Sequence, residues 1–180
     1  MEALFYILLA LFVIAEVFIA VRYVKMGKSS CVKYTAVPTA VFLSYLLMLC
    51  ILRISIPYLV LIFATITVFA HTFVGLYLNL YRKGKIFDRY LHGFGSFSFA
   101  LLLYLTLSKV TVPGGSTVFR AVFVAALGIA AGAIFEIVEF LHDLRNKTDM
   151  QRGLMDTDFD IVFDVIGSAA AAILAAFAYL

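Results

Sequence analysis

Residues 118–142 read VFRAVFVAALGIAAGAIFEIVEFLH, and between Arg120 and Glu136 this segment holds 15 consecutive uncharged residues. A helix needs about 20 predominantly apolar residues to cross the hydrocarbon core of a bilayer. The segment is therefore long and apolar enough for a transmembrane helix. Its only acidic residues and its histidine stand near its end, at Glu136, Glu139 and His142.

The rest of the chain shares this composition. Of the 180 residues, 64% are hydrophobic and 14% are charged, whereas soluble domains average about 45–50% apolar and about 25% charged residues. We expect a single transmembrane domain over residues 1–180, an all-α bundle of six helices in the cell membrane. The predicted spans are 3–21, 35–52, 56–80, 92–108, 118–142 and 159–179.

Polar segments and helix-breaking residues separate these spans. Residues 53–57 are expected to form a short turn, because proline disfavours a helical conformation at the residue before it. Residues 82–85 are expected to end the third span, and residues 113–116 (Pro-Gly-Gly-Ser) have turn chemistry. Residues 145–158 form the longest polar connection. The first span lacks a basic n-region and a small-x-small cleavage pattern, so we expect a retained helix and not a secretory signal.

The distribution of lysine and arginine predicts the orientation. Connections one, three and five hold 11 of these residues, connections two and four hold three, and the termini hold none. Short cytoplasmic loops carry an excess of positive residues. The odd-numbered connections are therefore expected in the cytoplasm and both termini outside the cell.

On this topology the acidic residues and the histidines gather in the cytoplasmic half of the bundle. Of the 11 acidic residues, only Glu2 is expected on the outer side. Asp88 and His92 are four residues apart, and so are Asp160 and Asp164. Each pair therefore shares one face of its helix. Polar side chains from several spans are expected to meet in one pocket.

This pocket has the composition of a metal site. Glu139-x-x-His142 has the spacing by which carboxylate-bridged dimetal proteins offer ligands from one helix. An ionised side chain at mid-bilayer costs about 2.5–3.5 kcal/mol on insertion scales, and Arg89, Arg145 and Arg152 offset only part of the negative charge. A divalent metal would neutralise more, and carboxylate with imidazole suits Mg, Mn, Fe or Zn. The expected ligands, or residues that support ligands, are Asp88, His92, Glu136, Glu139, Asp160 and Asp164.

Other polar residues have simpler explanations. Asp156 and Asp158 are suited to cap the N-terminus of the last span, where the helix dipole favours negative charge. Glu16 and His71 either serve a function or hydrogen-bond within the bundle, and the sequence leaves both readings open. Residues 128–132 (Gly-Ile-Ala-Ala-Gly) form a small-xxx-small motif, which predicts close packing of two helices.

The second half of the chain contains three short polar motifs, Asp88-Arg89-x-x-His92, Glu136-x-x-Glu139 and Asp160-x-x-x-Asp164-x-x-Gly167. Together they resemble the VanZ-like membrane proteins, which are associated with glycopeptide-antibiotic resistance. The chain is more similar still to the YjdF-like family of polytopic bacterial inner-membrane proteins, whose Asp-Thr-x-x-Asp element matches residues 156–160. The resemblance covers residues 85–170 and implies an inner-membrane helical bundle.

Two positions depart from the VanZ-like pattern. Glu139 stands where that family usually has glutamine, and Asp164 stands where it usually has asparagine. Both departures add negative charge, which favours the binding of a metal or a proton. The resemblance therefore supports the site more than it supports a particular activity.

The first expected function is a metal-dependent enzyme acting on a lipid or lipid-linked substrate at the inner leaflet. Bound metal can activate water or polarise a phosphoryl oxygen there, and His142 or Asp156 is the expected general base. Membrane lipid is the expected partner, and a homo-oligomer is compatible with the lack of a soluble domain. The formal net charge of +3, with no basic run, argues against nucleic acid.

Two alternatives stay open. The first is a small transporter coupled to ions or protons, because intramembrane ionisable residues often mark ion pathways. Against it, the polar groups gather at one face and the sequence shows no inverted repeat. The second is a non-catalytic membrane scaffold, in which a buried polar network fixes the packing of the helices.

Overall fold

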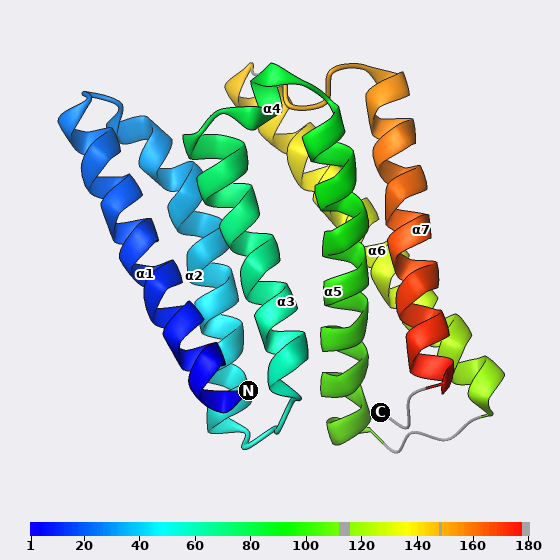
Figure 1. The fold of residues 1–180 in the computed structure, drawn as a ribbon. Coiled ribbons are helices and arrows are strands. Elements are labelled where there is room, and N and C mark those ends of the chain that lie inside the picture. Colours follow the sequence, from blue (N-terminus) through cyan, green and yellow to red (C-terminus); the bar gives the residue numbers. More distant parts are fainter. Residues whose placement is uncertain (112–115, 148, 178–180) are drawn as a thin grey trace. The chain divides into compact units, whose positions relative to one another are not determined.

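The computed structural model describes residues 1–111, 116–147 and 149–177, with the side chain of Ser30 excepted, and all regular structure in these ranges is helical (Figure 1). Seven α-helices and one π-helix are present in the described ranges. In chain order they are α1 (Glu2–Lys25), α2 (Ser29–Ile51), α3 (Tyr58–Phe69), η1 (Ala70–Tyr77), α4 (Leu80–Lys83), α5 (Ile86–Val110), α6 (Thr117–Asn146) and α7 (Leu154–Phe177).

Six helical segments are long and apolar enough to cross a membrane. They are α1, residues Cys31–Ile51 of α2, the continuous segment Tyr58–Tyr77, α5, α6 and α7. Large apolar side chains are exposed along these helices, as is expected of surfaces that face lipid. The all-α class with six spans is therefore confirmed, and the chain is a multi-pass membrane protein.

Several helices have other bounds than the predicted spans, in most cases because the helices continue past their apolar centres. The helix expected at 35–52 begins at Ser29, and the one expected at 92–108 begins at Ile86. Helix α6, expected to end at residue 142, continues to Asn146. Polar ends of this kind are expected in the headgroup layer, which extends a bilayer from about 30 Å to about 40–45 Å.

The third span also ends earlier than expected. The segment predicted at 56–80 is α-helical only to Phe69, continues as a π-helix to Tyr77 and is followed by the left-handed residue Asn79 (φ 63°). Residues 82–85, expected to end this span, therefore lie beyond it, and part of them belongs to the short helix α4. A left-handed residue cannot continue a right-handed helix, and asparagine tolerates this conformation better than most residues.

The last span begins at Leu154 instead of residue 159. Asp156 and Asp158 are therefore not its N-cap, as the sequence suggested, but lie inside the helix, with Asp156 in the first turn. The helix dipole still favours an acidic residue at this position. The connection expected at 145–158 shortens to residues 147–153. Residues 178–180, which include the expected end of the span, lie outside the described residues.

The other connections have identifiable causes. The expected turn at residues 53–57 is confirmed, and it places Arg53 in the left-handed region (φ 54°). Helix α6 begins where the side chain of Ser116 accepts a hydrogen bond from the backbone N–H of Phe119 (3.2 Å), which satisfies one of the free donors of the first turn. Of the turn expected at 113–116, residues 113–115 lie outside the described part of the chain.

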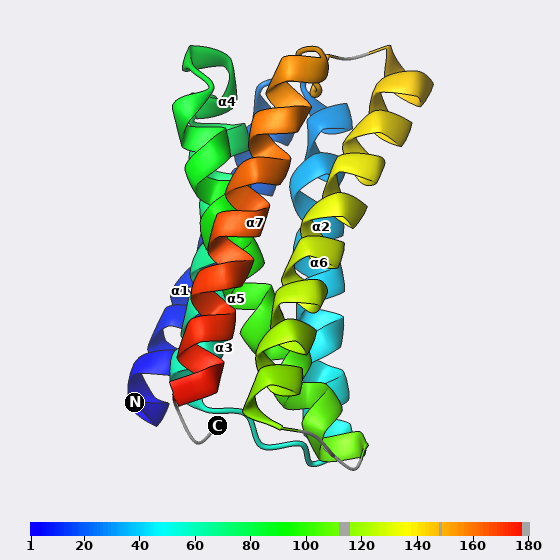
Figure 2. The same ribbon diagram turned by 90° about the vertical axis from the view of Figure 1, so that its right-hand side faces the viewer.

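The chain divides into two compact units, Met1–Phe87 and Asp88–Leu180. In the first unit, α1, α2, α3 and η1 pack on one another. In the second, α6 packs along α7 (Figure 2). The single domain expected over residues 1–180 stays a prediction.

Close packing in the second unit depends on glycine residues. A Cβ atom on Gly128 would overlap the Ser168 hydroxyl, and one on Gly132 would overlap the Asp164 carboxylate. The small-xxx-small motif therefore lies against α7. The nearest approach is between α7 and α5, because a Cβ on Gly167 would overlap the backbone carbonyl of Gly93.

We expect Gly167→Ala to destabilise the second unit, because the Gly93 backbone cannot rotate away as a side chain can. Overpacking of this kind costs about 1–3 kcal/mol. The expected result is a lower midpoint of thermal unfolding in detergent. Gly84→Ala is the matched control, since nothing lies within 4 Å of a Cβ there and its φ of 173° is open to any residue. Equal midpoints for the two variants would contradict the close approach of α5 and α7.

Candidate functional site

Six carboxylates and one imidazole are buried together at one end of the second unit, where α5 and α7 begin and α6 approaches its end (Figure 2). None of the seven side chains belongs to a residue more than 7% exposed. We call this group the acidic cluster, and it consists of Asp88, His92, Glu136, Glu139, Asp156, Asp160 and Asp164. Six members were predicted as ligands or supporting residues and Asp156 as a general base.

His92 is fixed in orientation by α7. Its Nδ1 atom lies 3.3 Å from both carboxylate oxygens of Asp164. The Ser96 hydroxyl, one helical turn after His92, donates a hydrogen bond of 2.6 Å to the same carboxylate. Because a carboxylate accepts hydrogen bonds, Nδ1 carries a proton in this arrangement and the lone pair of a neutral ring lies on Nε2. Gly132 provides the space for the Asp164 carboxylate.

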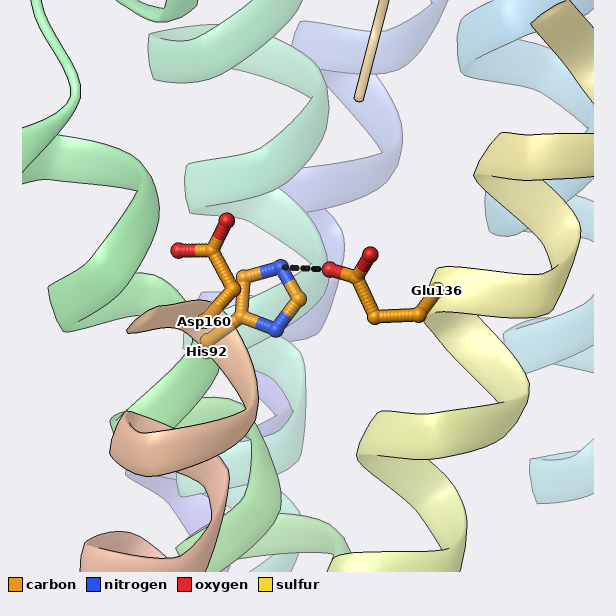
Figure 3. A group of neighbouring side chains, drawn as sticks. All are labelled: His92, Glu136 and Asp160. Atoms are coloured by element: carbon orange, nitrogen blue, oxygen red, sulfur yellow. Dashed lines mark ion pairs between the residues drawn. The ribbon is translucent and has the colours of Figure 1, made fainter. Parts of the chain in front are cut away.

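The opposite side of the His92 ring faces two further carboxylates (Figure 3). His92 Nε2 lies 3.5 Å from Glu136 Oε1. One ligand atom each from His92, Glu136 and Asp160 lie within 4.8 Å of one another. Within the described ranges, His92 Nε2, Glu136 Oε1 and Asp160 Oδ1 are buried and have no hydrogen-bond partner. We call these three residues the His92 group.

Asp160 also belongs to a second group of residues whose possible ligand atoms lie close together. Asp88, Asp156 and Asp160 each offer an oxygen within 4.8 Å of the others. Here, however, a cation is already present. The Arg152 guanidinium donates to Asp88 Oδ2 at 2.5 Å and to Asp156 Oδ2 at 2.9 Å. Arg152 therefore compensates the negative charge of this set, which we call the Arg152 group.

Two residues of the connection before α7, Met150 and Gln151, are hydrogen-bonded to α6. The Asp143 carboxylate accepts hydrogen bonds from the backbone N–H groups of Met150 and Gln151 at 2.8–2.9 Å. The Gln151 side chain then donates to Glu136 Oε2 at 2.8 Å and to the Glu136 carbonyl at 2.9 Å. One oxygen of Glu136 is thus held by the connection while the other faces His92.

Of the three arginines expected to offset the charge, Arg152 is bonded to the acidic cluster in the described part of the chain. Arg89 lies over the ring of Phe159, with its Cζ atom 4.1 Å from the ring centroid, and Arg145 is exposed. Among the described residues, six carboxylates therefore share one bonded arginine and one imidazole. Excess buried charge of this kind is costly unless another cation or protons compensate it.

The two expected general bases lie in different surroundings. Asp156 is buried in the Arg152 group and is bound by the guanidinium. His142 is partly exposed on α6, with its Nδ1 atom 3.9 Å from Asp143 Oδ1, and belongs to neither group of ligand atoms. Glu139 is buried on the same helix and also belongs to neither group.

Sequence reasoning missed two polar partners, Ser96 and Gln151, and the specific part played by Arg152. Ser96 could have been found, because it stands four residues after His92 and so shares its helix face. Gln151 lies in an irregular connection, where no periodicity indicates which way a side chain points. Neither could be assigned to a partner before the helices were placed.

Comparison with known proteins identifies the family of this chain, but the descriptions of the matches name no activity. The model of the family described as "Predicted membrane protein (DUF2238)" matches residues 4–179. A Thermotoga maritima protein described as "Uncharacterized protein" is 37% identical over 108 residues, which are 56% of this chain and 53% of the relative. The matched region thus spans about half the length of this curated relative. No solved structure matches the chain.

We expect Arg152→Gln to destabilise the second unit, because it leaves Asp88 and Asp156 buried without their cation. Removing one partner of a buried ion pair costs about 3–5 kcal/mol, and the 22% exposure of the Arg152 side chain places the loss at the low end. Thermal unfolding in detergent with a chelator present measures the effect. The control is Arg145→Gln, the same change at an exposed position, and equal stability of both variants would contradict the bridging role.

Proposed function

This chain belongs to the DUF2238 family of predicted membrane proteins, and we propose that its acidic cluster binds a divalent metal ion for a reaction on a lipid or lipid-linked substrate. The observation that carries the proposal is the His92 group. His92, Glu136 and Asp160, from three helices, each offer one ligand atom within 4.8 Å of the others, and each has a buried side-chain nitrogen or oxygen without a hydrogen-bond partner in the described ranges. A buried polar atom without a partner costs free energy unless something binds it.

The surroundings of His92 support metal binding over simple ion pairing. Histidines that bind metals usually donate their other ring N–H to a carboxylate, which fixes the tautomer and directs the lone pair at the metal. Asp164 and Ser96 supply this support at Nδ1. In this proposal Asp164 is a positioning residue, although the sequence suggested it equally as a ligand.

The charge distribution favours the His92 group over the Arg152 group. Arg152 already neutralises much of the charge on Asp88 and Asp156, whereas no arginine or lysine is bonded to Glu136 or Asp160 among the contacts of the described residues. A divalent cation at the His92 group would supply the missing positive charge. Asp160, which belongs to both groups, would link the metal to the Arg152 side of the cluster.

The ligand set narrows the choice of metal. One imidazole with carboxylates suits Mn, Fe or Zn better than Mg, which prefers oxygen ligands and bound water. When bound, such a metal polarises a substrate oxygen or lowers the pKa of bound water. Three protein ligands leave a position for substrate, as in catalytic zinc sites. Asp156, next to Asp160 in the cluster, and His142 are the proposed general bases.

The position of the cluster favours a substrate that belongs to the membrane. Asp88 and Asp156 are each the third residue of their helices, and His92 and Asp160 are each the seventh. At 1.5 Å per residue these positions lie about 3–9 Å from the helix starts, a depth at which lipid headgroups and the first acyl carbons are found. The excess of Lys and Arg in the adjoining connections assigns this end to the cytoplasm.

We expect the purified protein to hold about one divalent ion per chain, as a site with three protein ligands does. Asp160→Asn should lose this ion, because it removes charge from the His92 group without changing side-chain volume. Asp158→Asn is the control, since it makes the same change two residues away at an exposed position. Elemental analysis after purification in a metal-replete buffer measures the content.

The outcomes separate the competing functions. If the unaltered protein contains no bound metal, the metal proposal is wrong. Ion or proton flux in proteoliposomes, without bound metal, would favour the transporter. If substitutions in the cluster reduce the folded yield but the protein shows neither metal nor flux, the cluster is a structural network. Bound metal together with turnover of a lipid headgroup supports the enzyme.

We expect Ser96→Ala to weaken metal binding without abolishing it, because it releases the Asp164 carboxylate that orients His92. Loss of such a supporting contact typically costs about 10–100-fold in metal affinity. Competition with a chelator of known affinity gives the dissociation constant. The control is Ser108→Ala on the same helix, where the hydroxyl donates to the Leu105 carbonyl of the preceding turn (2.8 Å). Equal affinities in the two variants would contradict the positioning role.

A further inference from the structure

The Arg152 group (Asp88, Asp156 and Asp160) has a ligand set of its own beside the His92 group. Asp88 lies on α5 and the other two carboxylates lie on α7, and the three residues are 5%, 1% and 3% exposed. Each offers one oxygen within 4.8 Å of the oxygens offered by the other two. Three buried carboxylates at this spacing form an all-oxygen ligand set, which hard divalent cations prefer.

The bonds of Arg152 to this group go to one oxygen of each of two carboxylates. The guanidinium donates to Asp88 Oδ2 and to Asp156 Oδ2. The other oxygen of Asp88, Oδ1, lies 3.9 Å from His92 Nε2 and so connects this group with the His92 group. Carboxylates that bind metals are themselves hydrogen-bonded by outer residues, which fix their orientation. Arg152 can therefore act as such an outer residue while the carboxylates bind an ion.

Asp160 belongs to both groups of possible ligand atoms. The residue is 3% exposed, and its Oδ1 atom is buried without a hydrogen-bond partner in the part of the chain that the structure describes. A buried polar atom of this kind costs free energy unless something binds it. Because a carboxylate has two oxygens, Asp160 can bind one ion through each oxygen and so bridge two ions.

The charge of the acidic cluster exceeds what one divalent ion can balance. Among the described residues, Arg152 is the arginine bonded to its six buried carboxylates. Arg152 and one divalent ion supply three positive charges against six ionised carboxylates, and a second divalent ion raises the total to five. Buried charges without compensation are costly, above all within membrane helices. A second ion would therefore remove most of the remaining imbalance.

We infer that a second divalent ion, Mg²⁺ or Mn²⁺, binds between Asp88, Asp156 and Asp160, so that Asp160 bridges it to the ion of the His92 group. The inference rests on the proposed function, since the first ion is the one proposed there. Paired ions of this kind lie about 3.5–4 Å apart. The second ion binds more weakly than the first, because Arg152 and the first ion both repel it. Asp156 then serves as a ligand, which leaves His142 as the proposed general base.

The test titrates Mn²⁺ into the unaltered protein in detergent, after a chelator has removed bound metal and has itself been removed. Mn²⁺ suits both ligand sets, because it accepts carboxylates and imidazole. Free Mn²⁺ gives a six-line electron paramagnetic resonance signal that is lost on binding, so the signal counts the bound ions. We expect two ions per chain, the second with the higher dissociation constant. At a separation of about 3.5–4 Å the two ions are magnetically coupled, and a coupled spectrum should grow as the second ion binds.

The number of bound ions separates this inference from the proposed function. If no ion binds, both are wrong. One ion per chain at saturation would support the first ion and overturn the second, with protons balancing the remaining carboxylates. Two ions without magnetic coupling would overturn the bridge through Asp160.

Substitutions assign the ligands of the second ion. Asp156→Asn changes a ligand of that ion alone at nearly constant volume, because Asp156 belongs to the Arg152 group and not to the His92 group. We expect the dissociation constant of the second ion to rise by more than the about 10–100-fold that is typical of a supporting residue, while the first ion binds as before. Asp160→Asn should weaken the binding of both ions. Asp158→Asn is the matched control, since it makes the same change at an exposed position.

Asp88→Asn provides a second measurement should Asp156→Asn fail to fold. It changes another carboxylate of the same group, on a different helix, and should likewise lose the second ion. Retention of the second ion in both Asp88→Asn and Asp156→Asn would overturn the assignment of the ligands. Its loss in Asp158→Asn would do the same.

Discussion

The burial of carboxylates between apolar helices is the constraint on which the second unit depends. Each of these groups would be solvated in water, and each must find compensation once the helices close around it. Arg152 compensates Asp88 and Asp156, Ser96 and His92 compensate Asp164, and Gln151 compensates one oxygen of Glu136. The negative charge left without such a partner among the described residues is on Glu136, Glu139 and Asp160, and the metal proposal follows from this excess of charge.

Small residues make this concentration of charge possible. Gly132 leaves room for the Asp164 carboxylate, and the pair Gly93 and Gly167 lets the backbones of α5 and α7 approach closely. Side chains at these positions would separate the helices and move the carboxylate of Asp164 away from His92. The packing of the helices and the geometry of the site are therefore consequences of the same residues, and a change in one is expected to alter the other.

The same constraint acts on a smaller scale in the first unit. A single buried carboxylate, Glu16, accepts a hydrogen bond from the Thr72 hydroxyl. Among the described residues of the second unit, six buried carboxylates share one bonded arginine and one imidazole.

The amino-acid sequence was sufficient for the membrane class, the six spans and the gathering of Asp88, Glu136 and Asp160 at one end, because hydropathy and helical spacing report length, composition and shared faces. It misplaced the starts of α5 and α7, since polar residues in the headgroup layer continue a helix without an apolar signal. Only the tertiary structure assigned Asp164 to one nitrogen of His92 and Glu136 to the other, and Arg152 to Asp88 and Asp156. Those assignments depend on the rotation of each helix about its axis and on the positions of residues 149–153, and no local sequence pattern determines either of these.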